Sequence, residues 1–310
     1  MQLEVNGHNT FCYTGGKAFD PAKPTVVFIH GVLNDHSVWI LQTRYLANHG
    51  WNVLAPDLPG HGRSGGEPPA TVEQGADFVL ALVEVLKIKR LALVGHSFGS
   101  LIVLEAAARA ARAAGTADGA PGDKISGDPS PPQPVRAPDA PAGEKAPPRQ
   151  AGVTVSHLVL AGTAAPMKVS QTLLDASLNE PLKGIDMVNV FQHSMLAPPP
   201  STLGPGTWLY GSSRALMRRV LASNVRTNVF HTGFRACDSY SKGEAAMKEV
   251  EAPTLFILGT RDQMTPPKAA QPLVRNARHG KTVLLPAGHQ MMSEAPDGVL
   301  MALRDFLAEA

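Results

Sequence analysis

Residues 91–99 constrain the fold of this chain more than any other stretch. They contain an apolar run and then a G-x-S-x-G pattern centred on Ser97, and a second apolar run follows at 100–109. This order predicts a buried strand that turns sharply into a buried helix, with the serine strained at the turn. Gly95 and Gly99 fit because the flanks of so tight a turn must be small. The positive end of the helix favours a developing negative charge beside Ser97, which is therefore the predicted nucleophile.

Short runs rich in Val, Ile and Leu alternate with helical patterns along most of the chain. The predicted strands lie at 25–29, 51–55, 91–95, 155–163, 253–259 and 281–285, and the predicted helices of this part at 37–49, 71–87, 100–109, 266–276 and 297–308. Residues 3–13, with the turn pair Asn6-Gly7, predict a hairpin at a sheet edge. The alternation predicts an α/β fold, doubly wound, with a mostly parallel sheet and its active site at the carboxyl ends of the strands.

Two segments interrupt this alternation. Residues 115–152 are dominated by Pro, Ala, Gly and charged side chains, so we expect a disordered insertion at the edge of the sheet opposite the active site. Between 164 and 251 strand signals disappear, and helical patterns occur at 170–177, 185–196, 212–223 and 228–237. We therefore predict a core formed by residues 1–163 and 252–310, and a helical cap formed by residues 164–251.

Composition excludes several classes of function. The net charge of the 310 residues is +2 and no basic run stands out, so no nucleic-acid partner is expected. No apolar run approaches the length of a membrane span, and the N-terminal residues lack the pattern of a signal peptide. The two cysteines, Cys12 and Cys237, are expected to be free thiols in a reducing compartment, which favours a cytoplasmic location.

A serine nucleophile needs a general base, and the base needs an acid that fixes its tautomer. Asp262 and His289 both follow predicted strands, in the chain order Ser, Asp, His that accompanies a G-x-S-x-G turn. A rival aspartate, Asp238, falls in a predicted cap helix. The backbone N–H groups of Phe98 and Val32 are the predicted donors to the oxyanion of an acyl-transfer reaction.

Five short motifs together resemble the α/β-hydrolase fold family, in particular its esterase, haloperoxidase-like and C–C hydrolase branch. They are His30-Gly31, the loop 57–64, the Ser97 motif 95–99, the segment 259–262 and Gly288-His289. The resemblance implies an eight-stranded type of sheet and a hydrolytic activity. The chain differs from haloalkane dehalogenases and epoxide hydrolases, because these enzymes use an aspartate as nucleophile where this sequence has Ser97. The chain also lacks the His-Gly-Gly-Pro-Gly loop of proline iminopeptidases and the glycine-rich loop of meta-cleavage-product hydrolases.

The predicted cap and the loops near the triad contain many adaptable apolar side chains. We expect the substrate pocket to include Met187, Phe191, Trp208, Met264 and Met292, with Met195, Met217, Phe230, Phe234 and Met291 as further candidates. No cluster of Arg or Lys accompanies them, which favours an uncharged acyl substrate of small to medium size.

The sequence therefore predicts a serine hydrolase that cleaves carboxylic esters through an acyl-enzyme and acts on a small molecule. No cofactor is expected. No metal is expected either, because His30, His36, His61 and His96 are dispersed in predicted loops. The same triad leaves open cleavage of thioesters, lactones or C–C bonds, and perhydrolase or hydroxynitrile-lyase-like activity. A non-catalytic relative that only binds a ligand is the alternative from another class.

Overall fold

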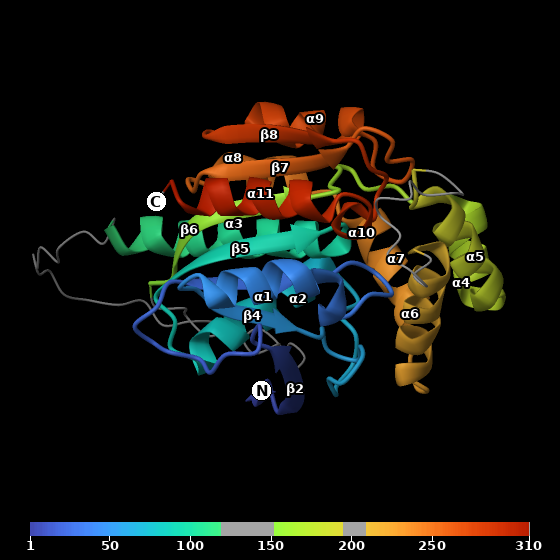
Figure 1. Ribbon diagram of the computed structural model, residues 1–310, viewed down its shortest axis with the longest axis horizontal. Helices are drawn as coiled ribbons and strands as arrows, with labels where there is room; N and C mark the ends of the chain where they lie inside the picture. Colours follow the sequence, from blue (N-terminus) through green and yellow to red (C-terminus); the bar gives the residue numbers. More distant parts are fainter. Residues whose placement is uncertain (119–151, 195–208, 310) are drawn as a thin grey trace, which may run out of the picture.

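The computed structural model describes residues 1–118, 152–194 and 209–309. An eight-stranded sheet runs through them in the order β1-β2-β4-β3-β5-β6-β7-β8 (Figure 1). The strands are β1 (Gln2–Val5), β2 (His8–Tyr13), β3 (Thr25–Ile29), β4 (Asn52–Pro56), β5 (Arg90–His96), β6 (Thr154–Ala161), β7 (Thr254–Gly259) and β8 (Gly280–Leu285). Only the pairs β1–β2 and β2–β4 are antiparallel. The predicted α/β class and mostly parallel sheet are confirmed.

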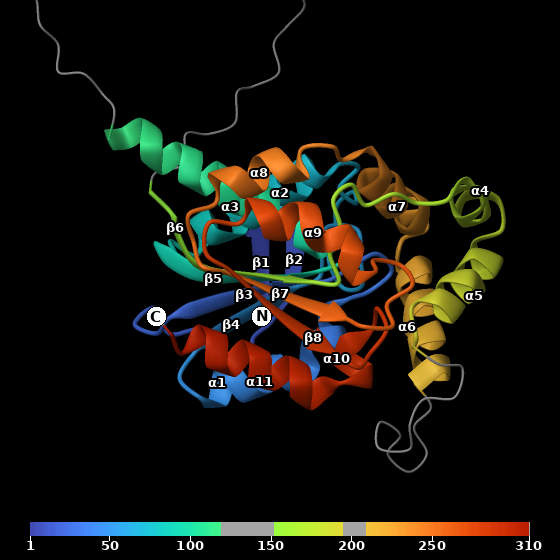
Figure 2. The ribbon, with the colours of Figure 1, turned by 90° about the horizontal axis from the view of Figure 1, so that it is seen from above.

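Helices cover both faces of the sheet, as Figure 2 shows. One face carries α1 (Ile40–Asn48) and α11 (Pro296–Leu307), and the other carries α2 (Val72–Val85), α3 (Phe98–Asp118), α8 (Gly243–Glu249) and α9 (Pro267–Asn276). Strands β3, β4 and β7 are buried along their whole length. This explains their continuous apolar runs, because a central parallel strand packs against helices on both sides.

Local signals in the sequence account for several element boundaries. Asn6 and Gly7 form the predicted hairpin turn with φ of 52° and 76°. The Thr71 hydroxyl accepts a hydrogen bond of 3.2 Å from the N–H of Gln74 and so caps α2. The short helices η1 (His36–Trp39) and α10 (Met291–Glu294) were not separately predicted.

Four helices between β6 and β7 lie beyond the carboxyl ends of the strands (Figure 1). We call them the outer helices: α4 (Gln171–Asn179), α5 (Pro181–Phe191), α6 (Leu209–Ser223) and α7 (Val229–Ser239). Their own apolar cluster includes Ile185, Met217 and Phe230. All four were predicted, although α5 both begins and ends several residues earlier than the predicted 185–196. Helix α8 in the same region was not predicted. The division into core and cap at 164 and 251 stays a prediction, since α8 falls within 164–251 but packs on α3 and α9.

The segment 115–152 lies mostly outside the described residues. Its first four residues continue α3, which ends at Asp118, so the predicted start of disorder is too early. On the other side, β6 begins at Thr154, which pairs with Arg90 at the start of β5. That end of β5 is opposite the end that leads to Ser97. The placement of the insertion away from Ser97 stays a prediction. Among the described residues, no helix is both long and apolar enough to cross a bilayer.

Candidate active site

Ser97 occupies the turn between β5 and α3, as predicted. Its φ of 54° lies in the left-handed region, which is strained for a residue with a side chain. A Cβ atom at Gly95 would collide with the Gly99 carbonyl, and one at Gly99 with the Ile29 carbonyl, so both positions require glycine. The N–H of Ser97 donates to Ala161 O at 2.9 Å. These contacts hold Ser97 at the carboxyl edge of the sheet.

His289 and Asp262 form a buried hydrogen-bonded pair at the same edge. Asp262 follows β7 and His289 follows β8, and His289 Nδ1 donates to Asp262 Oδ2 at 2.8 Å. The other oxygen, Oδ1, accepts from the N–H groups of Met264 and Thr265 at 2.8 and 2.7 Å. Burial alone would raise the pKa of Asp262, but His289 and the hydrogen bonds outweigh it and lower this pKa to about 2. The Asp262 carboxylate is therefore ionised at neutral pH.

Thr265 is a polar member of this site that the sequence reasoning missed. Its hydroxyl donates to Asp262 Oδ2 at 2.8 Å and lies 3.0 Å from His289 Nδ1. The side chain is 4% exposed. A usable signal was its position three residues after Asp262, where a Thr often bonds back to an aspartate in a turn.

His96 holds the backbone of His289 by a hydrogen bond. Its Nε2 donates to the His289 carbonyl at 2.9 Å, and the two rings are 4.7 Å apart. Burial, reinforced by the proximity of His289, lowers the pKa of His96 to about 3, so its ring is neutral at pH 7. Gly162, with φ of 55°, lies against both rings, and a Cβ there would approach the His289 ring to 3.2 Å. The imidazole of His289 thus has little room to move.

The predicted oxyanion donors belong to two segments that adjoin Ser97. Phe98 is the first residue of α3 and is 1% exposed. Val32 follows Gly31 in the loop after β3, and a Cβ at Gly31 would lie 3.1 Å from Ser97 Cβ. The structure therefore brings the loop of Val32 against the serine. The role of the two backbone N–H groups as oxyanion donors stays a prediction.

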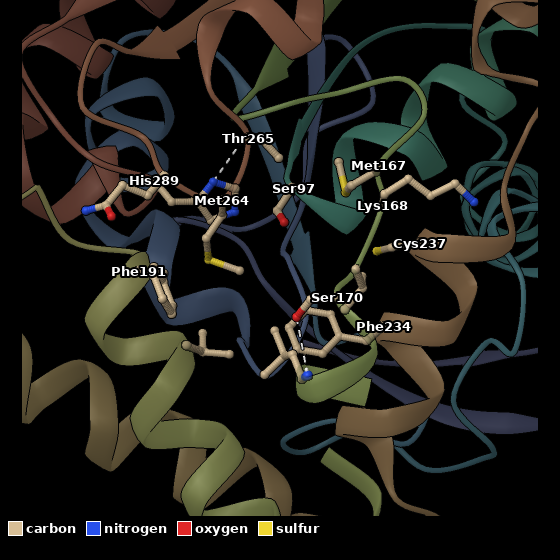
Figure 3. Close-up of a pocket in the computed structure, with 14 residues that line it drawn as sticks. Ser97, Met167, Lys168, Ser170, Phe191, Phe234, Cys237, Met264, Thr265 and His289 are labelled. Atoms are coloured by element: carbon tan, nitrogen blue, oxygen red, sulfur yellow. Dashed lines mark hydrogen bonds between the residues drawn. The ribbon is translucent and has the colours of Figure 1, made fainter. Parts of the chain in front are cut away.

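A cavity of about 280 Å³ opens between this edge and the outer helices (Figure 3). Ser97 and His289 lie in its wall, and the serine side chain points into it. The lining is Ser97, Met167, Lys168, Val169, Ser170, Leu173, Val188, Phe191, Phe234, Cys237, Gln263, Met264, Thr265 and His289. The Lys168 ammonium is held by the Asp238 carbonyl at 2.8 Å, so it does not project into the cavity unpaired.

The predicted pocket residues separate into three groups. Phe191, Met264 and the further candidate Phe234 line the cavity. Met187 and Met292 do not: Met187 is half-buried elsewhere on α5, and Met292 is buried in the apolar cluster beneath the sheet. Met291 belongs to that same cluster, while Met217 and Phe230 form the core of the outer helices. Trp208 and Met195 lie outside the described residues.

The segment that links β6 to α4 supplies lining residues that sequence reasoning did not select. Met167, Lys168, Val169 and Ser170 all contact the cavity. Their position directly after a central strand was the available signal, because that is where active-site loops begin in parallel sheets. Cys237 also lines the cavity; both cysteines are free and buried.

Asp35, His36 and Asp57 are close enough to hold a metal ion. Their ligand atoms already bind protein groups. Asp57 accepts from the N–H and Nδ1 of His36 at 2.9 and 2.7 Å, and Asp35 accepts from Arg219 at 2.8 Å. This network fixes the loop after β3 to the loop after β4.

Comparison with known proteins gives a consistent family. The model of the Alpha/beta hydrolase family matches residues 26–302. Among solved structures, the enol-lactonase from Burkholderia xenovorans LB400 has a TM-score of 0.73 and 20% identity, covering 99% of this chain and 100% of that one. The esterase EaEST from Exiguobacterium antarcticum has a TM-score of 0.72 and 15% identity, covering 99% and 98%.

A curated protein, the lipase LipV of Mycobacterium tuberculosis, is 33% identical over 91 residues, which are 29% of this chain and 34% of that protein. An epoxide hydrolase of Caballeronia sordidicola is 33% identical over 82 residues, 26% of this chain and 25% of that protein. The chain thus spans only a quarter to a third of the length of these two curated relatives. The structural matches extend over the whole fold.

Proposed function

The chain belongs to the alpha/beta hydrolase family, and on that premise we propose that it is a serine hydrolase that cleaves carboxylic esters. In this proposal Ser97 is the nucleophile, His289 the general base and Asp262 the acid that orients it. The N–H groups of Val32 and Phe98 are the oxyanion donors. The outer helices form the cap that receives the acyl group. The substrate is a small molecule, and the two buried free thiols agree with a cytoplasmic location.

One observation supports this proposal above all others. A serine with φ of 54° and a histidine hydrogen-bonded to an ionised, buried aspartate share one wall of one cavity. A strained serine and a buried His–Asp pair each carry a cost in free energy, and such features cluster at catalytic sites.

The chemistry follows from these positions. His289, whose Nδ1–H is directed at Asp262, has Nε2 free to accept the proton of Ser97 as its oxygen attacks the ester carbonyl. The tetrahedral oxyanion is stabilised by the two backbone donors and by the N-terminal end of α3. His289 then donates the proton to the leaving alcohol. Water, activated by the same histidine, hydrolyses the acyl-enzyme and restores Ser97.

The cavity supports an apolar acyl group of small to medium size. Its walls include Val188, Leu173 and Phe234, and about 280 Å³ is at the small end of ligand pockets. The serine nucleophile argues against the epoxide-hydrolase chemistry of one relative, because that reaction uses an aspartate at the corresponding turn.

Lactone hydrolysis is the second candidate. Two structurally similar proteins act on lactones by name, the enol-lactonase and Est816, an N-acyl homoserine lactone degrading enzyme. A lactone is a cyclic ester, so its cleavage needs the same triad and oxyanion donors.

The proposal is tested with p-nitrophenyl esters from acetate to decanoate, alongside simple γ-lactones, for the wild type and Ser97→Ala. Loss of the nucleophile is expected to lower kcat by about 10⁶-fold, as in other serine triads. The chain length with the highest kcat/KM measures the acyl site, and turnover of lactones in preference to esters would favour the second candidate. A folded wild type that is inert on both series would contradict the proposal.

A further inference from the structure

The C-terminal end of α5 is fastened to the loop that carries His289. The N–H of Gln290 donates to Gln192 O at 3.0 Å, and the Gln290 amide Nε2 donates to Gln192 Oε1 at 3.0 Å. The two segments approach so closely that a Cβ at Gly288 would lie 2.6 Å from the N–H nitrogen of Ser194. Residues adjoining His289 on both sides therefore contact residues 192–194, which directly follow α5.

Glu294 joins the two segments through its carboxylate. Oε1 accepts from the N–H and the hydroxyl of Ser194 at 2.9 and 2.8 Å, while Oε2 accepts from the N–H of Gly288 at 2.5 Å. The residue is 6% exposed. A single side chain thus accepts from two backbone N–H groups, one in each segment.

The same helix also forms part of the cavity wall. Val188 and Phe191 of α5 line the cavity into which Ser97 points (Figure 3). A group bound against this wall contacts a helix that is followed by Ser194. Ser194 donates to Glu294, and Glu294 also accepts from Gly288, the residue directly before His289.

We propose that Glu294 is a positioning residue that couples α5 to the general base. The helix that lines the cavity would then also determine the position of His289. This inference rests on the proposed function. It assigns to Glu294 no contact with the reacting atoms. Its effect on the reaction passes through Gly288 and the His289 loop.

The outer helices have a second attachment, which does not reach the triad. Ser223 Oγ accepts from the N–H of Gly62 at 3.0 Å, Asn224 donates to Gly60 O at 3.2 Å, and the Thr227 hydroxyl donates to Glu67. This attachment ends on the loop after β4. Glu67 is therefore a matched control: it also joins an outer segment to the core, but away from His289.

Replacement of Glu294 by glutamine weakens the hydrogen bonds to one of the two segments with little change in the shape of the side chain. A glutamine amide has one accepting oxygen, and its NH₂ group would face one of the N–H donors. Ser194→Ala removes only the hydroxyl arm and leaves both backbone contacts. The pair of variants therefore weakens one bridge to two different degrees.

The test compares the wild type with Glu294→Gln, Ser194→Ala, the double variant and Glu67→Gln in hydrolysis of p-nitrophenyl butyrate. A displacement of about 1 Å at a catalytic group costs up to about a hundredfold, so kcat of Glu294→Gln is expected to fall ten- to a hundredfold with KM nearly unchanged. Ser194→Ala should lose less, and the double variant no more than Glu294→Gln alone, since both act through one bridge. Glu67→Gln should keep the wild-type kcat.

Amide hydrogen exchange gives a readout that does not depend on turnover. In Glu294→Gln, exchange should rise together in peptides that cover 189–194 and 286–294, and Glu67→Gln should leave both unchanged. A rise in only one of them, or an unchanged kcat in a folded Glu294→Gln variant that turns over esters, would overturn the inference. An inert wild type whose two peptides still respond together would instead count against the proposed function. Ser194→Ala carries the same test if Glu294→Gln does not fold.

Discussion

The carboxyl edge of the sheet and the outer helices form opposite walls of the cavity, and the two walls differ in the chemical character of their side chains. At the sheet edge, Asp262 accepts hydrogen bonds from His289, Met264 and Thr265, and His289 is held by His96 as well. The outer helices contribute mainly apolar side chains, such as Val188 and Phe234. Hydrogen bonds fix a direction, whereas apolar contacts tolerate changes of shape. We therefore propose that the chemical steps take place at the first wall and that the second wall selects among substrates.

This division can be tested by substitutions on each side. Changes at the sheet edge should lower kcat for every ester, and changes in the outer helices should alter the order of preference among esters. Glu294 is the proposed connection between the two walls, and its variants should lower kcat without a change at the triad itself.

Among substitutions that keep Ser97 and His289, the largest effect is expected from Asp262→Asn. The substitution preserves shape, but the asparagine favours the wrong tautomer of His289, which in a serine triad costs about 10⁴-fold in kcat. Steady-state kinetics on p-nitrophenyl butyrate measure it. Asp238→Asn is the matched control, since Asp238 lies in α7 and accepts from the N–H of Val169 at 3.1 Å. Equal losses in the two variants would contradict the division.

The buried histidines of the core should make folding sensitive to acid. Burial lowers the pKa of His96 to about 3 and, together with the proximity of His30, that of His61 to about 4. Both values lie below the ordinary 6.5, so between pH 6.5 and 4 the unfolded chain binds more protons than the folded one. The free energy of unfolding should therefore decrease as the pH is lowered through this range, by about 1.4 kcal/mol per histidine and pH unit.

Urea unfolding at pH 8, 6 and 5 measures this loss. His61→Gln should weaken the dependence on pH, because one of the buried histidines with a lowered pKa is removed. The same urea midpoint at pH 8 and pH 5 for the wild type would show that these side chains are not kept neutral in the fold.

In the outer helices, Val188→Phe should shorten the accepted acyl chain. The larger ring occupies part of the cavity, and a change of one or two methylene groups in an apolar pocket is worth about tenfold or more. The ratio of kcat/KM for hexanoate to that for acetate should therefore fall about tenfold. Val190→Phe, on the same helix but 43% exposed, is the control. An equal loss of kcat/KM for all esters would instead show that Val188 affects the reaction itself and not the choice of acyl chain.

The smallest effect is expected from Thr265→Val. Its hydroxyl bridges Asp262 and His289, and removal of one neutral hydrogen bond costs about 0.5–1.5 kcal/mol, or about three- to tenfold in kcat. Thr265→Ser should retain most of the activity because it keeps the hydroxyl. Equal kcat for the valine and serine variants would remove Thr265 from the group that orients the histidine.

The sequence was informative where a single chemical property determines the structure. Strands β3 and β7 were predictable because both faces are buried, and Ser97 because a tight turn needs the glycines on either side. Asp262 and His289 could be selected because each follows a strand, which places both at one edge of a parallel sheet.

Other features depend on three-dimensional neighbours that no local pattern reveals. Met264 lines the cavity, whereas Met292 is buried in the apolar cluster that includes residues of α11, although each methionine closely follows Asp262 or His289 in the sequence. Glu294 shows no partner in the sequence, because Ser194 lies 100 residues earlier in the chain and the fold brings the two together. Helices as short as α10 have too few turns to show a periodicity.

The central claim is that Ser97 is a nucleophile activated by His289. Its most direct test is covalent labelling with an alkyl fluorophosphonate, followed by mass spectrometry of the intact protein and its peptides. We expect one adduct per chain, located on Ser97, and labelling at least about 10³-fold slower in His289→Ala, since the base is then lost. An adduct on another residue, or labelling of Ser97 at an equal rate in His289→Ala, would contradict the account.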